Sequence, residues 1–432
     1  MKTHLVVLAA LAAACAETSS STGGDAAADA VDAAPDVVDA TSDLGRDVAP
    51  EAAADVPGGS CRWRVGAAVD LPGQGAGVRC ALADLAAGAP GAWVARACDR
   101  LAGDADARQP LVIDRVDATG ATASTTRAAE GATARAWLAV DDALDRRAVL
   151  RRGPMGGGES IVTLGRDGAP TGAQPVASAP THFSLGDHQD LAVDRAGFTT
   201  VAQQIRALWG VSLLHLDAAG RAVEAVDLMP TGAFIPRIKR VATADRGFFL
   251  AWAEGADAGP GSLRVRRYRE NGTAVSFTAV LDARLTSAAA TAPLRVAIAP
   301  TAGGALAVWE AEADTLPPLR TLAARPLADD ATPRADASLL TSLGFYGGGL
   351  DAAAAGGDVL VTAVTGSGVL RLVVAALGPD GSPRGEPLQV AMVAPPSPDG
   401  VFARVVPTAS GALVAFQRDA ATVAVAPLTC ER

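Results

Sequence analysis

One pattern of apolar and polar residues repeats along most of the chain. Stretches such as RVATADRGFFLAWAE, from Arg240, and RVVPTASGALVAFQ, from Arg404, each predict an apolar strand, a glycine-containing turn and a second apolar strand. Weaker copies of the pattern fill the intervals, so that the units begin 50 to 56 residues apart. The seven starting positions are Arg79, Arg135, Asp190, Arg240, Arg295, Leu350 and Arg404.

A second turn recurs between these copies, with apolar runs before it and strand-like segments after it. It reads as LDAAG, RENG or GPDG, and Asp-Gly or Asn-Gly turns between apolar runs indicate hairpins. Its glycines are Gly120, Gly168, Gly220, Gly272 and Gly381. The fifth unit has LADDAT, residues 327–332, in place of the glycine turn. Each unit therefore contains about four short antiparallel strands.

Seven such units predict an all-β fold, a seven-bladed β-propeller over residues 61–432. The kelch period is similar, but the kelch double glycine and the WD dipeptide are absent, so no named repeat family is assigned. Six or eight blades remain alternatives. A β-helix is disfavoured because its repeats are much shorter.

The ends of this region suggest how the ring closes. The last unit ends after its third strand, and the segment Cys61–Leu71 can supply the fourth. Four cysteines of the body allow three connectivities, which the sequence alone does not decide. The closed ring places Cys430 beside Cys61, and Cys80 faces Cys98 across a hairpin, so we expect the disulfides Cys61–Cys430 and Cys80–Cys98.

The N-terminus has the parts of an export signal over residues 1–14: a basic start at Lys2 and the apolar run Leu5–Ala14. This run is too short to span a bilayer, and no later run reaches the necessary length. Leu11–Cys15 resembles a lipobox, although Ala12 stands where leucine is usual. The alternative is an ordinary signal peptide that is cut after Ala14 or Ala16.

With its predicted propeller, the chain resembles secreted bacterial lipoproteins in general. The resemblance implies a lipid (palmitate) on Cys15 and anchoring to the outer membrane or cell surface, because Ala16 rather than aspartate follows. Cys15 is then the odd cysteine, and the other four form disulfides in an oxidising compartment.

Residues 15–60 are rich in alanine and aspartate, contain no aromatic residue, and predict a disordered, self-repelling tether. Acidic residues recur there every three or four positions, but Pro35 and Pro50 oppose a helix. Most of the net charge of −10 lies in this segment, so the acidic character belongs to the tether. Export makes a nucleic-acid partner unexpected.

Cations at the start of the repeats are the first candidate site. If they share one level in the ring, they would attract carboxylates, phosphates or acidic glycans, since guanidinium suits such anions. The alternative is that they lie between blades and pair with neighbouring carboxylates. The candidates are Arg79, Arg135, Arg240, Arg295 and Arg404, with Arg237 and Lys239 adding charge.

A second candidate is the stretch THFSLGDHQD, where His182, Asp187, His188 and Asp190 could hold a metal ion. No His-x3-His or Cys-x2-Cys spacing supports this reading, and a solvated loop is the alternative. No cofactor is expected. His215, which alternates with leucines, is expected to be packed or hydrogen-bonded.

No G-x-S-x-G, H-E-x-x-H or phosphate-binding loop occurs in the sequence. We therefore expect a monomeric, membrane-anchored binding or scaffold protein that engages a protein or an anionic ligand. The alternatives are a propeller hydrolase acting on a glycan or peptide, and a structural surface lipoprotein without a small ligand.

Overall fold

The computed structural model describes most of the chain from Cys61 onward. The described ranges are 61–75, 78–100, 110–129, 133, 135–153, 158–176, 190–204, 210–230, 238–243, 245–256, 259–285, 296–312, 320–340, 349–366, 369–394 and 402–431. All regular structure in these ranges is β-strand, and they hold no helix that could span a membrane. The export signal, Cys15 and the tether lie outside these ranges and stay predictions.

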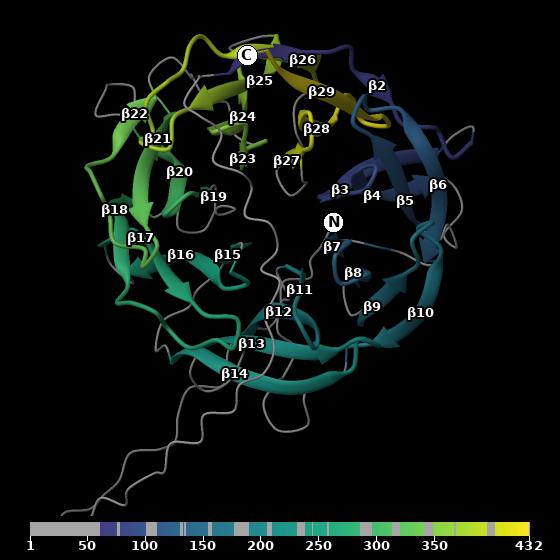
Figure 1. The fold of residues 1–432 in the computed structure, drawn as a ribbon, viewed down its shortest axis with the longest axis horizontal. Helices are drawn as coiled ribbons and strands as arrows, with labels where there is room; N and C mark the ends of the chain where they lie inside the picture. Colours follow the sequence, from purple (N-terminus) through teal and green to yellow (C-terminus); the bar gives the residue numbers. More distant parts are fainter. Residues whose placement is uncertain are drawn as a thin grey trace, which may run out of the picture. The chain divides into compact units, whose positions relative to one another are not determined.

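Seven antiparallel sheets are arranged in a ring (Figure 1). Blades 1 to 3 consist of β3 (Val78–Gly88), β4 (Gly91–Arg100), β5 (Leu111–Asp117), β6 (Thr122–Ala129); β7 (Arg135–Asp141), β8 (Arg146–Arg152), β9 (Glu159–Leu164), β10 (Pro170–Pro175); and β11 (Ala192–Val193), β12 (Gly197–Gln204), β13 (Gly210–Asp217), β14 (Ala222–Pro230). Blades 4 and 5 consist of β15 (Ile238–Ala242), β16 (Phe248–Ala256), β17 (Gly259–Tyr268), β18 (Ala279–Leu285); and β19 (Val296–Thr301), β20 (Gly304–Glu312), β21 (Arg320–Ala328), β22 (Ser338–Leu340). Blades 6 and 7 consist of β23 (Asp351–Ala355), β24 (Asp358–Thr365), β25 (Leu370–Leu377), β26 (Leu388–Val393); and β27 (Ala403–Thr408), β28 (Gly411–Gln417), β29 (Val423–Glu431), β1 (Arg62–Val65). The predicted all-β propeller with seven blades is confirmed, and the six-blade, eight-blade and β-helix alternatives are wrong.

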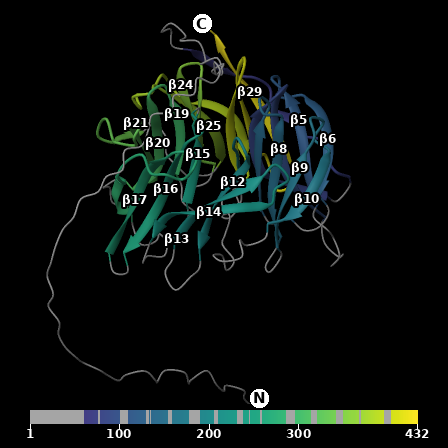
Figure 2. The ribbon, with the colours of Figure 1, turned by 60° about the horizontal axis from the view of Figure 1, so that its bottom comes forward.

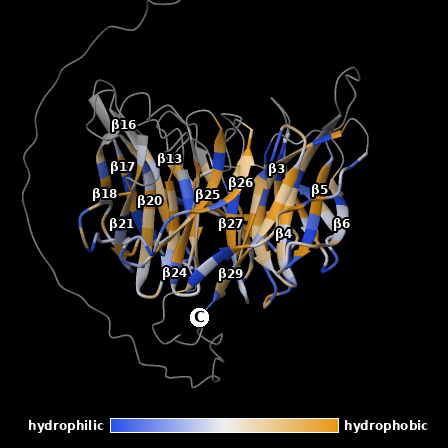
Figure 3. Cartoon of the chain, turned by 90° about the horizontal axis from the view of Figure 1, so that it is seen from above, coloured by the Kyte–Doolittle hydropathy of each residue, from blue (hydrophilic) through white to orange (hydrophobic). Residues whose placement is uncertain are grey.

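The burial of the strands follows their place in a blade. The first strand of each blade lies nearest the centre of the ring, and the strands run between two faces of the disc (Figures 1 and 2). Second strands such as β24 and β28 are buried on both sides because neighbouring blades cover them, whereas the outermost β10 is largely exposed. The middle strands of the blades are rich in apolar residues, as along the second strands β4 and β20 and the third strand β25 (Figure 3).

The ring closes as the sequence predicts. β1 pairs with β29, and Trp63 lies opposite Cys430 in the register. The predicted disulfide Cys61–Cys430 is present and joins residues that are 369 positions apart. Trp63 Nε1 also donates to Asp358 Oδ2 of blade 6 at 2.9 Å, so the N-terminal strand contacts two blades. A short strand β2 (Val69–Asp70) pairs further along β29.

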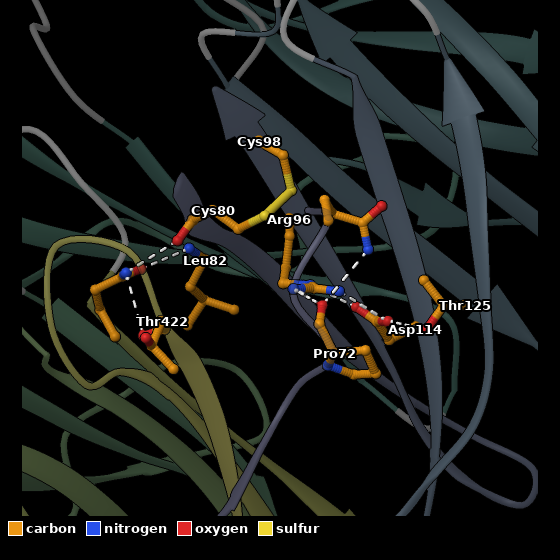
Figure 4. Close-up of a disulfide and its surroundings, with 10 residues drawn as sticks. Pro72, Cys80, Leu82, Arg96, Cys98, Asp114, Thr125 and Thr422 are labelled. Atoms are coloured by element: carbon orange, nitrogen blue, oxygen red, sulfur yellow. Dashed lines mark hydrogen bonds and ion pairs between the residues drawn. A yellow bond between two sulfur atoms is a disulfide. The ribbon is translucent and has the colours of Figure 1, made fainter. Parts of the chain in front are cut away.

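The second predicted disulfide, Cys80–Cys98, joins β3 to β4 (Figure 4). Close to it, Arg96 and Asp114 form a buried ion pair, with Nε 2.5 Å from Oδ2. Arg96 Nη1 donates to the carbonyl oxygen of Pro72 at 3.0 Å. This hydrogen bond attaches the segment that leaves blade 7 to the sheet of blade 1, and the ion pair holds Arg96 in place for it.

The recurring glycine turns join third and fourth strands, and their glycines have φ between +81° and +87°. A non-glycine residue rarely takes this conformation, yet Ala331 has it, at φ 67°, in the fifth unit that lacks the glycine. These turns and those joining first to second strands lie on one face of the disc, the hairpin face. A Cβ on Gly220 would come within 2.1 Å of Ile161 Cγ2 in blade 2. That glycine thus also permits close packing of two blades.

Candidate functional site

One level of the inner strands is strongly charged. The first two strands of each blade form a hairpin. In each of the seven blades, one residue lies four positions before the last paired residue of the first strand, so these seven residues occupy the same register position. We call this set the channel level. It consists of Asp84, Trp137, Asp190, Lys239, Ala297, Asp351 and Arg404.

The predicted arginines do not share this level. Arg404 lies on it, Arg240 is one residue closer to the turn, and Arg79 and Arg135 are farther from the turn and exposed. The reason is that the inner strands differ in length, and β3 has 11 residues and a bulge between Leu82 and Asp84. Alignment from the starts of the repeats therefore hid Asp84. Arg237 and Arg295 lie outside the described residues.

Arg404 and Lys239 have carboxylate partners from other blades. Arg404 Nε lies 3.3 Å from Asp84 Oδ1, and its Nη1 lies 3.7 Å from Asp351 Oδ1. Lys239 Nζ lies 3.6 Å from the same oxygen of Asp351. The exposed fractions of these four side chains are between 12% and 29%, so the charges are partly shielded from water.

The carboxylates also connect consecutive blades. Asp84 Oδ2 accepts the backbone N–H of Leu138 in blade 2 at 2.9 Å. In the equivalent way, Asp351 Oδ2 accepts the N–H of Val405 in blade 7 at 3.0 Å. Each acceptor therefore fixes the residue that follows the channel level in the next blade.

Asp190 also connects two consecutive blades, but its partner in the next blade is a side chain instead of a backbone N–H. Its Oδ2 pairs with Arg240 Nε of blade 4, and its Oδ1 accepts the N–H of Val201 at 2.7 Å. Arg240 also donates to the side chain and carbonyl of Thr199, at 2.9 and 2.8 Å. Only 3% of the Arg240 side chain is exposed, so this cation is not presented to a ligand.

Burial shifts the protonation equilibria at the channel level. Burial raises the pKa of Asp84, although Arg404 and the N–H of Leu138 oppose the change. Burial and then Arg404 lower the pKa of Lys239, against the effect of Asp351. Burial opposes the charge of Arg404, yet Asp351 and Asp84 raise its pKa.

The charges of this group balance one another. Three carboxylates, Asp84, Asp190 and Asp351, face three cations, Lys239, Arg240 and Arg404. For Arg240 and Arg404, the structure thus agrees with the alternative reading, in which the arginines lie between blades and pair with carboxylates. The arrangement joins blades, and each of its cations already has a carboxylate partner.

Three of the four residues of the predicted metal site lie outside the described residues. His182, Asp187 and His188 lie outside the described residues, and Asp190 is engaged by Arg240 and Val201. Within the described ranges, no three or more histidine, cysteine or acidic side chains group as metal ligands.

A different group of polar residues lines a cleft on the hairpin face, between blades 3 and 4. The cleft has a volume of about 530 Å³. It is formed by the turn before β12, the turn before β16, the connection after β17, and a side chain of β13. Its lining residues are Asp194, Arg195, Ala196, His215, Asp245, Arg269, Glu270 and Asn271.

Hydrogen bonds fix one wall of the cleft. Asp194 Oδ2 lies 3.3 Å from His215 Nδ1, and Asp194 Oδ1 accepts the N–H of Gly197 at 2.5 Å. Burial opposes the charge of Asp194, but these two hydrogen bonds lower its pKa. Arg146 of blade 2 donates to the carbonyl oxygens of Asp194 and Arg195, at 2.5 and 2.6 Å. The turn is therefore held in place without a ligand.

The remaining charges differ in how far they are satisfied. Asp245 accepts two bonds from Arg267, at 2.6 and 2.7 Å. Glu270 Oε1 accepts the backbone N–H of Arg195 at 3.1 Å. The guanidinium groups of Arg195 and Arg269 have no hydrogen-bond or ion-pair partner among the described residues. The cleft thus carries cationic groups that can accept an anion.

Sequence reasoning missed this cleft. His215 is hydrogen-bonded, as expected, but its partner Asp194 was not identified. The other lining residues belong to turns more than 20 positions apart in the sequence, where polar residues are ordinarily solvated. Only the assumption that equivalent turns of neighbouring blades lie side by side could have brought them together.

The closed ring of four-stranded blades defines the chain as a β-propeller protein. No family model and no curated protein matches its sequence. The fold is similar to a protein of unknown function from Dyadobacter fermentans DSM 18053, with 10% identity and a TM-score of 0.47 over 87% of this chain and 100% of that chain. It is also similar to polysaccharide lyase Uly1, with 11% identity and a TM-score of 0.46 over 80% of this chain and 89% of that chain. The β-propeller domain of the Trilobed protease from Pyrococcus furiosus has 10% identity and a TM-score of 0.45, over 78% and 92%. These likenesses concern the fold and say nothing about a ligand.

Proposed function

We propose that the protein is an extracytoplasmic binding protein that holds a polar ligand in the cleft between blades 3 and 4. The observation that supports this proposal is the contrast in pairing. Lys239 and Arg404 of the channel level, and Arg240 next to it, have carboxylate partners, whereas Arg195 and Arg269 have none among the described residues. A volume of about 530 Å³ suits a small ligand.

The cleft can be tested without knowledge of the ligand. Ala196 is an exposed lining residue, so Ala196→Trp should fill the cleft without loss of a buried contact. Ala219→Trp is the matched control, since Ala219 is exposed on another turn of the hairpin face. Thermal unfolding of the exported chain is measured with galacturonate, galactose, glucose 6-phosphate and trialanine. A ligand at 100 times its Kd adds about 2.7 kcal/mol to stability.

We expect at least one compound to stabilise the wild type and Ala219→Trp, but not Ala196→Trp. Equal stabilisation of all three proteins would exclude the cleft as the site. Stabilisation by none of the compounds would count against a small polar ligand and favour the scaffold role.

A hydrolase is the second candidate, because the Asp194–His215 pair resembles the carboxylate–imidazole arrangement of general bases. A water beside the free ring nitrogen would lose its proton to the imidazole. Product release from polysaccharides or peptides, lost in His215→Gln but kept in Ala219→Trp, would establish this activity. Binding without product release supports the binding protein.

The proposed location also has its own test. We propose that a lipid on Cys15 anchors the chain to the outer membrane, with residues 15–60 as the tether. Cys15→Ser should move the protein from the membrane fraction to the soluble fraction of the cell. Retention in the membrane fraction would show that the anchor is elsewhere.

A further inference from the structure

We infer that the cleft selects a hydroxyl-bearing ligand with a single carboxylate, of the sugar-acid class. This inference rests on the proposed binding function and names the chemistry of the same site. Arg195 and Arg269 both line the cleft, both are exposed, and neither guanidinium group has a partner among the described residues. Guanidinium binds carboxylates through two parallel N–H donors, which gives both strength and direction.

The acidic residues of the cleft favour a monoanion. Asp194 and Asp245 have partners of their own, His215 and Arg267. Glu270 uses Oε1 for the N–H of Arg195, and its other oxygen has no partner within the described part of the chain. That oxygen can accept a hydroxyl proton from the ligand. The same carboxylate repels a second negative charge, so a phosphate dianion should fit less well.

The lining favours a hydroxyl-bearing ligand over an apolar one. Ala196 is the only apolar residue among the eight that line the cleft. The amide N–H donors of Asn271, whose oxygen accepts the N–H of Thr273, and the free ring nitrogen of His215 add hydrogen-bonding groups. A sugar ring presents hydroxyls in several directions, so it can use several of these groups at once.

Calorimetric titration of the exported chain with defined probes tests the inference. The probes are galacturonate, galactose, glucose 6-phosphate and acetate. We expect galacturonate to bind at least about tenfold more tightly than the other three, since hydrogen bonds to charged groups are stronger than those between neutral groups. Tighter binding of glucose 6-phosphate or equal binding of galactose would overturn the inference.

Variants identify the residues. Arg195→Gln and Arg269→Gln should each weaken galacturonate binding about tenfold or more, whereas Arg79→Gln, on an exposed arginine outside the cleft, should bind like the wild type. Glu270→Gln should reduce the difference in affinity between glucose 6-phosphate and galacturonate. Unchanged affinity in both arginine variants would overturn the inference. If a different ligand binds and Ala196→Trp blocks it, the proposed function stands and the sugar-acid inference fails.

Discussion

The channel level and the cleft on the hairpin face contain the same kinds of side chain but use them differently. At the channel level and the position next to it, each of Lys239, Arg240 and Arg404 has a carboxylate partner from another blade. In the cleft, Arg195 and Arg269 have no such partner among the described residues. The comparison teaches that a cluster of arginines indicates a ligand only when its charges are not already satisfied.

The two regions also differ in their position on the blades. Channel-level residues lie on inner strands at one register position, where their carboxylates accept N–H groups of the next blade. Cleft residues lie mostly on turns, and exposed turns tolerate substitution because few buried contacts depend on them. Substitutions in the first region should therefore change stability, and those in the second should change binding.

The largest expected effect is that of Arg240→Ala. The substitution leaves Asp190 without its cation and removes two hydrogen bonds to Thr199. Loss of one partner of a buried ion pair costs about 3–5 kcal/mol of unfolding free energy. Chemical denaturation of the variant measures this loss.

The control is Arg269→Ala, in the cleft, which should stay within about 0.5 kcal/mol of the wild type. Equal losses in the two variants would remove the distinction between a paired and an unpaired arginine.

Asp351→Asn, a substitution on the channel level, should reduce stability less than Arg240→Ala. The amide oxygen can still accept the N–H of Val405, but the charge opposite Lys239 and Arg404 is lost. Because these side chains are partly exposed, we expect a loss of about 1–3 kcal/mol, below that of a fully buried pair.

Glu270→Gln is the matched change in the cleft and should leave the unfolding midpoint nearly unchanged. A wild-type midpoint in Asp351→Asn would indicate that the hydrogen bond to Val405, rather than the charge, joins blades 6 and 7.

Much of the fold could be predicted from the sequence because the signals are local and repeated. Glycines such as Gly220 mark hairpins that short-range geometry requires, and their spacing gives the number of blades. The partner of Cys61 followed from ring closure, and that of Cys80 from the hairpin that it shares with Cys98.

The candidate sites could be predicted only in part. Arg240 and Arg404 were identified as candidates, but they pair with carboxylates between blades. Asp84 was missed because the bulge in β3 changes the register between the start of that repeat and the channel level. The cleft depends on contacts between turns of two blades, and no local pattern distinguishes Arg195 or Arg269 from solvated turn residues. Long-range packing supplies that information.

The smallest expected effect concerns pH and has opposite signs in the two regions. The pKa of Asp84 is raised above 3.8, so its contribution to stability is complete below that pH and is lost as the pH rises through the folded-state pKa. The pKa of Asp194 is lowered, so its contribution is present above 3.8 and is lost as the pH falls through its folded-state pKa.

Asp84→Asn should therefore reduce the loss of stability between about pH 4 and pH 7, because the variant no longer has to ionise a shielded carboxyl. Asp194→Asn should instead reduce the loss of stability below about pH 4. Unfolding free energies measured across this range compare each variant with the wild type. Asp84→Asn could instead leave the pH dependence of the unfolding free energy unchanged above pH 4. The Asp84 carboxylate would then already be fully stabilised by Arg404, and the channel level would be as well neutralised as the Asp194–His215 pair in the cleft.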